Sequence, residues 1–286
     1  MGIRKITVLL KGVERDCALL DSAFAVSRRT IAHLDAVYLT LGPAEIETFR
    51  DHFFPEFPHD MEVKYLAECR SLAEQSRRQF DAWRQGQGLA DWDGAAFPLR
   101  TTAAWREDAR SADEAVRRLG RFCDLVVMHR PSGRLSALGR FILEALLFGS
   151  GHPTLLIPPS SAGLVLKSAV IAWNGSAEAT HAVTAALPLL RGMERVSILV
   201  AADPLDPNPE ADQLADYLRW HQIEAGIVLA SPAQPIGALL LAEATRLGAD
   251  LLVLGAYTHH PTREQILGGA TLHILKHAEI PVLMAH

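Results

Sequence analysis

The chain repeats one pattern of strands and helices, and this internal repeat constrains its fold more than any other feature. The segment Asp-Leu-Val-Val-Met at 124–128 resembles Asp-Leu-Leu-Val-Leu at 250–254. Each is followed by a loop, a stretch with apolar residues at helical spacing, and a second apolar run, at 153–157 and at 281–284. Both halves of the chain are therefore predicted to end in the order strand, loop, helix, strand.

The two halves also begin alike, with short β-branched apolar runs that alternate with segments of helical periodicity. The first half is predicted to form strands at 5–10, 34–41 and 96–101 and helices at 14–32, 61–83 and 105–119. The second half is predicted to form strands at 168–173, 195–201 and 223–229 and helices at 177–190, 210–220 and 235–247. Gly120 and Gly248 follow the third helix of each half, where a left-handed cap is expected.

Strands that are apolar along almost their whole length are typical of a parallel sheet covered by helices on both faces. The sequence therefore predicts an α/β fold made of two tandem Rossmann-like domains, which suits a length of 286 residues. The turn-rich segment 158–163 separates them, so the domains are placed at 1–158 and 164–286. An insert at 42–60, rich in Phe and Pro, is expected to be a surface loop packed on the first domain, with a lid or a partner surface as alternatives.

Composition and charge exclude several classes of protein. The net charge is −5 and no basic run occurs, so no nucleic-acid partner is expected. Cys17, Cys69 and Cys123 are few and widely spaced, which indicates a reducing compartment rather than a disulfide framework. No apolar run is long enough for a signal sequence or a bilayer-spanning helix. The sequence therefore predicts a cytoplasmic protein with no membrane partner.

The residues that follow two strands of the second half carry a family resemblance. Strand 168–173 runs into Asn174-Gly-Ser, and strand 250–254 runs into Gly255-Ala-Tyr-Thr258 and then Gly268-Gly269-Ala-Thr271. These loops resemble those of the universal stress protein family, whose nucleotide-binding members have G-x2-G-x9-G-[S/T] after strand four and an acidic residue after strand one. The resemblance covers the chain as two copies, of which 166–286 is the clearer. It implies a five-stranded parallel sheet of order 3-2-1-4-5 in each domain, of the adenine nucleotide alpha hydrolase-like type.

The resemblance further implies a site for ATP or AMP in the second domain. Ligands of open parallel sheets bind beyond the carboxyl ends of the strands where the strand order reverses. Glycines and a helix N-terminus there allow backbone N–H groups to approach phosphate. The expected cofactor-binding residues are Asn174 for the ribose, Ala201 near the base, and Gly255, Thr258, Gly268, Gly269 and Thr271 around the phosphates. The alternative for Gly268 and Gly269 is that they only permit close helix packing.

The second domain departs from the family pattern at three positions. Thr258 stands where the second glycine belongs, Gly269 replaces the Ser or Thr, and Asn174 replaces the acidic residue. An asparagine amide still hydrogen-bonds a ribose hydroxyl, but it carries no charge. A ligand-free second domain therefore stays open as an alternative.

The first half departs further from the pattern. After its fourth strand it reads His129-Arg-Pro-Ser-Gly-Arg, and the bulky Phe141-Ile-Leu stands near the place of the paired glycines. Gly149 and Gly151 are expected to cap the helix at 135–148. The first domain is therefore predicted to be a degenerate copy that binds no nucleotide.

No catalytic or metal-binding residue is predicted. His129 has no identifiable nucleophile partner, so a loop hydrogen bond is its expected role. His259 and His260 are adjacent and lack a third ligand at metal-binding spacing. Of the functions considered, a slow ATPase is the least favoured.

The expected function is that of a stress-associated regulatory protein that binds an adenine nucleotide in its second domain. The alternative is a ligand-free tandem module that acts through protein–protein interaction. The family resemblance implies that domains pair through their last strands, here 153–157 with 281–285, as a pseudo-dimer within one chain. Two chains are further expected to associate as a homodimer.

Overall fold

A computed structural model describes residues 2–39, 60–92, 99–108, 118–132, 136–161, 163–202, 209–256 and 269–286. The chain divides into two compact units, Ile3–His152 and Pro153–His286. The predicted insert at 42–60 lies almost wholly outside the described residues, and so do Thr258 and Gly268. The domain limits at 1–158 and 164–286 stay a prediction.

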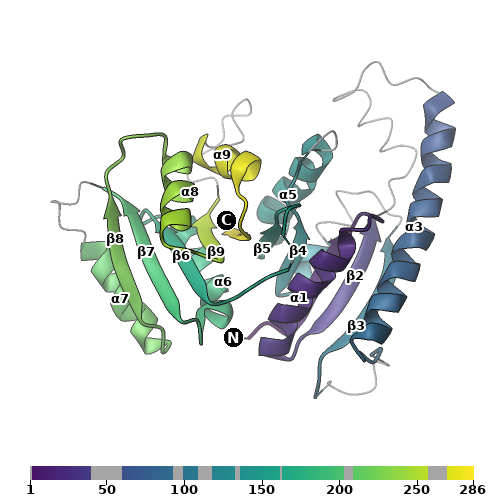
Figure 1. The fold of residues 1–286 in the computed structure, drawn as a ribbon, viewed down its shortest axis with the longest axis horizontal. Helices are drawn as coiled ribbons and strands as arrows, with labels where there is room; N and C mark the ends of the chain where they lie inside the picture. The colour runs from purple at the N-terminus through teal and green to yellow at the C-terminus, as the bar shows by residue number, and fades with distance from the viewer. Residues whose placement is uncertain are drawn as a thin grey trace. The chain divides into compact units, whose positions relative to one another are not determined.

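The first unit is a parallel sheet with helices on it (Figure 1). Its elements are β1 (Lys5–Leu10), α1 (Asp16–Thr30), β2 (His33–Leu39), α3 (Asp60–Gly86), β3 (Thr102–Asp108), β4 (Leu125–His129) and α5 (Ser136–Ser150). Its strands lie in the order β3-β2-β1-β4, and each neighbouring pair is parallel. This is the predicted order 3-2-1-4.

The core of this unit follows from the apolar spacing. In β1, β2 and β4 almost every residue is buried, as expected for strands covered on both faces. Helix α1 buries Leu19, Ala23 and Val26, which recur at the spacing of one helical face. Its first turn carries Asp16 and its last turn carries arginines, so its charges complement the helix dipole.

The second unit contains the sheet that the repeat predicts. Its elements are β5 (Thr154–Ile157), β6 (Ser168–Trp173), α6 (Ala177–Leu190), β7 (Arg195–Ala201), α7 (Pro209–Trp220), β8 (Ala225–Ala230), α8 (Ile236–Arg246), β9 (Leu251–Gly255), α9 (Gly269–His277) and β10 (Val282–Ala285). The parallel strands lie in the order β8-β7-β6-β9-β10, which is the predicted 3-2-1-4-5. The α/β class is confirmed.

Strand β5 is the last strand of the first half, but it pairs with the last strand of the second half. It lies in the second unit and pairs antiparallel with β10, with Leu155 opposite Leu283. The predicted pairing of the last strands of the two halves is thus confirmed. The pairing covers the short apolar edge of β10, which would otherwise be left open.

The repeated aspartate before each fourth strand has a structural role. Asp124 Oδ2 accepts hydrogen bonds from the backbone N–H groups of Arg4 and Lys5, at 2.7 and 2.9 Å. Asp250 Oδ2 accepts from Lys167 and Ser168, at 3.1 and 2.9 Å. In both halves the carboxylate satisfies N–H groups at the start of the first strand, so this part of the repeat fixes strand register.

Two predictions for the first half are wrong. The third strand is β3, at Thr102–Asp108 rather than at 96–101, so Trp105 lies in a strand and not in a helix. Edge strands tolerate charged residues, and the Arg-Glu-Asp end of β3 resembles a helix start.

Gly120 does not have the left-handed conformation that Gly248 has at φ +63°. A Cβ at Gly120 would lie 2.3 Å from Ser150 Cβ, so this glycine permits close packing on α5. Gly151, at φ +68°, follows α5 as predicted, whereas Gly149 lies within the helix, which continues to Ser150.

Among the described residues, no helix has the length and apolar character needed to cross a membrane.

Candidate functional site

The predicted site residues of the second unit gather at the carboxyl ends of three neighbouring parallel strands. Asn174 follows β6, Ala201 ends β7, and Gly255 ends β9. Strand β6 lies between the other two, with Trp173 paired to Val200 in β7 and Ala172 paired to Leu254 in β9. The strands therefore end at the same level, and the structure brings these three residues together where the strand order reverses.

The loop after β6 is a tight turn that starts helix α6. Gly175 has φ +74°, a conformation that glycine adopts without strain. The Asn174 side-chain oxygen accepts a hydrogen bond from the Ser176 backbone N–H at 3.2 Å. Ser176 Oγ accepts from the Ala179 N–H at 3.1 Å and caps the helix. Asn174 thus shapes the turn, while its side chain stays exposed at the end of the strand.

Gly255 has a packing role that the sequence motif does not reveal. A Cβ at this position would lie 2.4 Å from the backbone nitrogen of Ala179 and 2.5 Å from the carbonyl carbon of Glu178. Real Cβ atoms do not approach other atoms so closely. Gly255 therefore lets the first turn of α6 lie directly against the end of β9.

Gly269 differs from Gly255 in its surroundings. It is the first residue of α9, it is exposed, and no described atom lies within 4 Å of a Cβ built on it. Within the part of the chain that the structure describes, no residue packs closely on this glycine. The first turn of α9 holds no acidic residue, so the positive end of its dipole faces no carboxylate of its own helix.

Thr271 lies on the packed side of α9. It is 4% exposed and is buried together with Ile274 and Leu275. This burial favours a packing role for its side chain over a phosphate contact.

A carboxylate, that of Glu178, already lies in the first turn of α6. The pKa of Glu178 is lowered, first by a hydrogen bond from its own backbone N–H and further by the Ser176 hydroxyl and the nearby His286 and His181. The two histidines belong to one small network, because His286 Nδ1 contacts the Ala256 carbonyl oxygen at 3.0 Å and His181 Nδ1 contacts that of His286 at 3.3 Å. The N-terminus of α6 is therefore poorly suited to a further anion.

One residue near the site was not found from the sequence. Glu210, in the first turn of α7, lies over the turn, since a Cβ on Gly175 would be 2.2 Å from its Oε2. It places a carboxylate next to Asn174, which replaces the acidic residue of the family pattern. The buried indole nitrogen of Trp173 has no hydrogen-bond partner in the structure. No local pattern marks Glu210, because only the tertiary fold brings it to the loop.

The equivalent place in the first unit is filled by a buried carboxylate. Asp16 Oδ2 accepts hydrogen bonds from the backbone N–H groups of Lys11, Gly12 and Val13, at 2.9, 2.7 and 3.2 Å. These residues form the loop after β1. Three successive N–H groups directed at one oxygen are the geometry with which such loops bind anions.

His129 completes this internal network. At the end of β4, its Nε2 lies 3.1 Å from Asp16 Oδ1, and both side chains are buried. The pKa of Lys11 is lowered by burial, against the opposing effect of Asp16. His129 forms a hydrogen bond, as predicted, but it does so from the end of strand β4 to the first residue of α1 and not within a loop.

Helix α3 closes the same loop from outside. Gly12 has φ +74°, and a Cβ there would lie 2.7 Å from the carbonyl oxygen of Leu72. The loop that would approach a ligand in this unit is therefore packed against α3 and bonded to Asp16.

Comparison with solved structures identifies the fold. A universal stress protein from Archaeoglobus fulgidus DSM 4304 matches 98% of this chain and 95% of its own, with a TM-score of 0.70 at 12% sequence identity. The fold is that of the universal stress proteins. A putative universal stress protein from Pseudomonas aeruginosa UCBPP-PA14 covers 99% of this chain and 93% of its own, with a TM-score of 0.55 at 15% identity.

A functionally unknown protein from Pseudomonas aeruginosa PAO1 also matches, over 99% of this chain and 92% of its own, with a TM-score of 0.54 at 14% identity. No family model and no curated protein matches the sequence. The universal stress protein fold thus spans both units.

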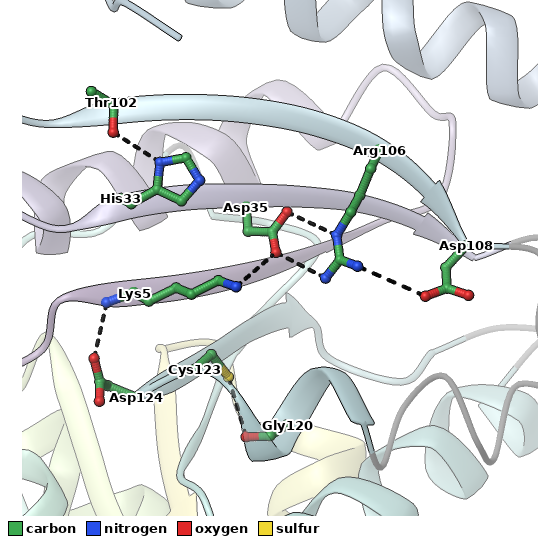
Figure 2. Close-up of polar contacts among 9 residues, drawn as sticks. All are labelled: Lys5, His33, Asp35, Thr102, Arg106, Asp108, Gly120, Cys123 and Asp124. Atoms are coloured by element: carbon green, nitrogen blue, oxygen red, sulfur yellow. Dashed lines mark hydrogen bonds and ion pairs between the residues drawn. The ribbon is translucent and has the colours of Figure 1, made fainter. Parts of the chain in front are cut away.

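A second polar cluster lies on the first universal stress protein-like sheet and is structural in character (Figure 2). Arg106 in β3 donates two hydrogen bonds to the buried Asp35 in β2, at 3.0 and 2.8 Å, and Lys5 lies 3.4 Å from the same carboxylate. His33 contacts Thr102 across the same two strands. The two cations of this cluster thus share one carboxylate, and the contacts connect β1, β2 and β3.

Metal binding finds no support in the part of the chain that the structure describes. Within it, no group of three His, Cys, Asp or Glu side chains is placed to hold a metal ion. His259 and His260 lie outside the described residues.

Proposed function

We propose that the second unit binds an adenine nucleotide, ATP or AMP, at the carboxyl ends of β6 and β9, and that the protein acts as a stress-associated regulator. The observation that carries this proposal is the difference between the two halves. In the first, Asp16 takes three N–H groups of the loop after the first strand. In the second, no described carboxylate accepts a hydrogen bond from the backbone of Asn174 or Gly175.

The phosphates are assigned to the N-terminus of α9. Gly269 is exposed there, nothing described lies within 4 Å of its missing side chain, and the first turn carries no acid. Such a terminus offers backbone N–H groups and a positive dipole end to phosphate oxygens. Gly268 and Thr258 belong to the same proposed phosphate loop.

The ribose is assigned to the loop after β6. Asn174 offers its exposed amide, and the Glu210 carboxylate lies over the adjoining Gly175. A carboxylate near this strand end is the group that accepts hydrogen bonds from ribose hydroxyls in related sheets. Ala201, at the end of the neighbouring strand, and the unpaired Trp173 indole N–H are assigned to the side of the base.

A ligand-free interaction module is the second candidate. It is favoured by Gly255 and Thr271, two residues of the glycine motif that the structure uses for packing. If the remaining motif residues serve packing as well, the second unit keeps the fold without the ligand.

The discriminating experiment is a thermal-shift titration of the full chain with ATP, ADP and AMP, together with mass spectrometry of small molecules released on denaturation. Saturation at about a hundredfold excess over Kd stabilises a protein by about 2.7 kcal/mol, which is readily detected. We expect a shift in the wild-type protein and its loss in Gly269→Val, because the valine side chain blocks the approach to the helix terminus.

Gly86→Val is the control, since Gly86 is the last residue of helix α3 and nothing described lies within 4 Å of a Cβ built on it. It should leave the shift unchanged. No released nucleotide and no shift at millimolar concentration would favour the interaction module. Equal binding by wild type and Gly269→Val would place the ligand elsewhere.

A further inference from the structure

The side chains of the loop after β6 are largely engaged within the loop itself. Asn174 Oδ1 accepts the backbone N–H of Ser176 at 3.2 Å, and Ser176 Oγ accepts that of Ala179 at 3.1 Å. These bonds hold both oxygens within the turn that starts α6. The remaining polar group of Asn174 is its NH2 group, which only donates. A hydroxyl bound here therefore needs an acceptor from another element.

Glu210 brings such an acceptor from α7. It lies in the first turn of that helix and is exposed. Its Oε2 would be 2.2 Å from a Cβ built on Gly175, so the missing side chain of this glycine lets the carboxylate approach the loop. The cation of α7, Arg219, lies in the last turn and pairs with Asp216 and Glu224. Glu210 therefore keeps its negative charge at the loop.

The charge of Glu210 is reinforced by its neighbours. Glu178 lies in the first turn of α6, and Asp212 lies in the first turn of α7. A carboxylate accepts hydroxyl protons strongly and repels a phosphate group at the same place. The helix turns beside this loop thus favour a neutral hydroxyl over an anion.

We infer that Glu210 makes the nucleotide site of the second unit selective for a ribose whose 2′ and 3′ hydroxyls are both free. The inference rests on the proposed nucleotide site and names the class of ligand that it takes. A ribose hydroxyl donates and accepts, so it suits both the Glu210 carboxylate and the Asn174 NH2 group. A carboxylate has two oxygens and accepts from two neighbouring hydroxyls. The ligand class is therefore a 5′-phosphorylated adenine ribonucleotide.

Two kinds of analogue are then bound weakly, for different reasons. A 2′-deoxy or 3′-deoxy nucleotide lacks one donor, which leaves the carboxylate without a partner. A 3′,5′-cyclic nucleotide lacks the 3′ hydroxyl and places a phosphate charge near Glu210. Sites built to hydrogen-bond a hydroxyl discriminate strongly against ligands without it.

The test is isothermal titration calorimetry of the full chain with ATP, 2′-deoxyATP, 3′-deoxyATP, AMP and 3′,5′-cyclic AMP. We expect the wild-type protein to bind ATP about tenfold or more tightly than either deoxy analogue, and AMP more tightly than cyclic AMP by a similar factor. Glu210→Ala should abolish both preferences. Glu210→Gln keeps an acceptor without the charge, so it should lose the preference for AMP over cyclic AMP and retain part of the other.

Asp212→Ala is the matched control, because Asp212 is an exposed acid in the same helix turn. It should keep both preferences, whereas a general effect of charge in the first turn of α7 would change both variants alike and overturn the inference. Equal binding of ATP and the deoxy analogues by the wild-type protein would overturn it too, while leaving the nucleotide site in place. No binding of any of the five nucleotides would overturn the inference and the proposed function together.

Discussion

At the scale of single residues, one buried aspartate explains why the two halves of this chain differ. Asp16 supplies to the loop after β1 the negative oxygen that a phosphate would otherwise supply. Its other oxygen is bonded to His129 at the end of β4. Because this carboxylate belongs to the chain itself, it competes with any dissolved anion for the same N–H groups.

Removal of this carboxylate should destabilise the first unit. In Asp16→Ala, three backbone N–H groups lose their acceptor and His129 loses its partner, so we expect a loss of about 3 kcal/mol in the free energy of unfolding. Urea unfolding followed by circular dichroism measures it. Asp212→Ala, at an exposed position in α7, should change stability by less than about 0.5 kcal/mol. A similarly small effect of Asp16→Ala would contradict the structural role given to this residue.

At the scale of secondary-structure elements, two glycines of one motif have opposite surroundings. Gly255 holds β9 against α6, with Ala179 nitrogen 2.4 Å from the place of a Cβ, whereas Gly269 is open. A sequence pattern cannot separate these cases, because glycine is required both where backbone packs on backbone and where backbone meets a ligand.

The two glycines should therefore respond differently to alanine. Gly255→Ala should destabilise the second unit by about 2 kcal/mol, since α6 must move away from the strand end. Gly269→Ala should leave the melting temperature almost unchanged, because glycine gains no packing there and alanine favours the helix. Differential scanning calorimetry of both variants gives the comparison. A tolerated Gly255→Ala would mean that α6 moves at little cost.

The helices and strands of the second half were predictable because their apolar residues recur at regular helix or strand spacing. The limits of β6, α6 and β7 coincide with those expected from apolar periodicity. Strand β3 was not predictable at its correct place, since its charged end and its position at an edge remove the signal of burial. Glu210 reaches its loop through tertiary folding, which no local spacing records. The same holds for the contact between Asp16 and His129, which are 113 positions apart in the sequence.

At the scale of the whole molecule, the two halves preserve one architecture and differ in what occupies the ends of the strands. Both begin with a strand whose first N–H groups are held by the aspartate before strand four, Asp124 or Asp250. This shared feature was visible as a repeat in the sequence. The difference in how the loop after the first strand is hydrogen-bonded was only partly visible, in the missing glycines of the first half.

We propose that one chain binds one nucleotide, in its second unit. Isothermal titration calorimetry of the full chain with ATP and with AMP tests it most directly, with wild type and Gly269→Val measured in parallel. We predict a stoichiometry of one per chain in the wild type and no heat of binding in the variant. A stoichiometry of two would show that the first unit also binds despite Asp16, and no binding to the wild type at millimolar nucleotide would contradict the claim altogether.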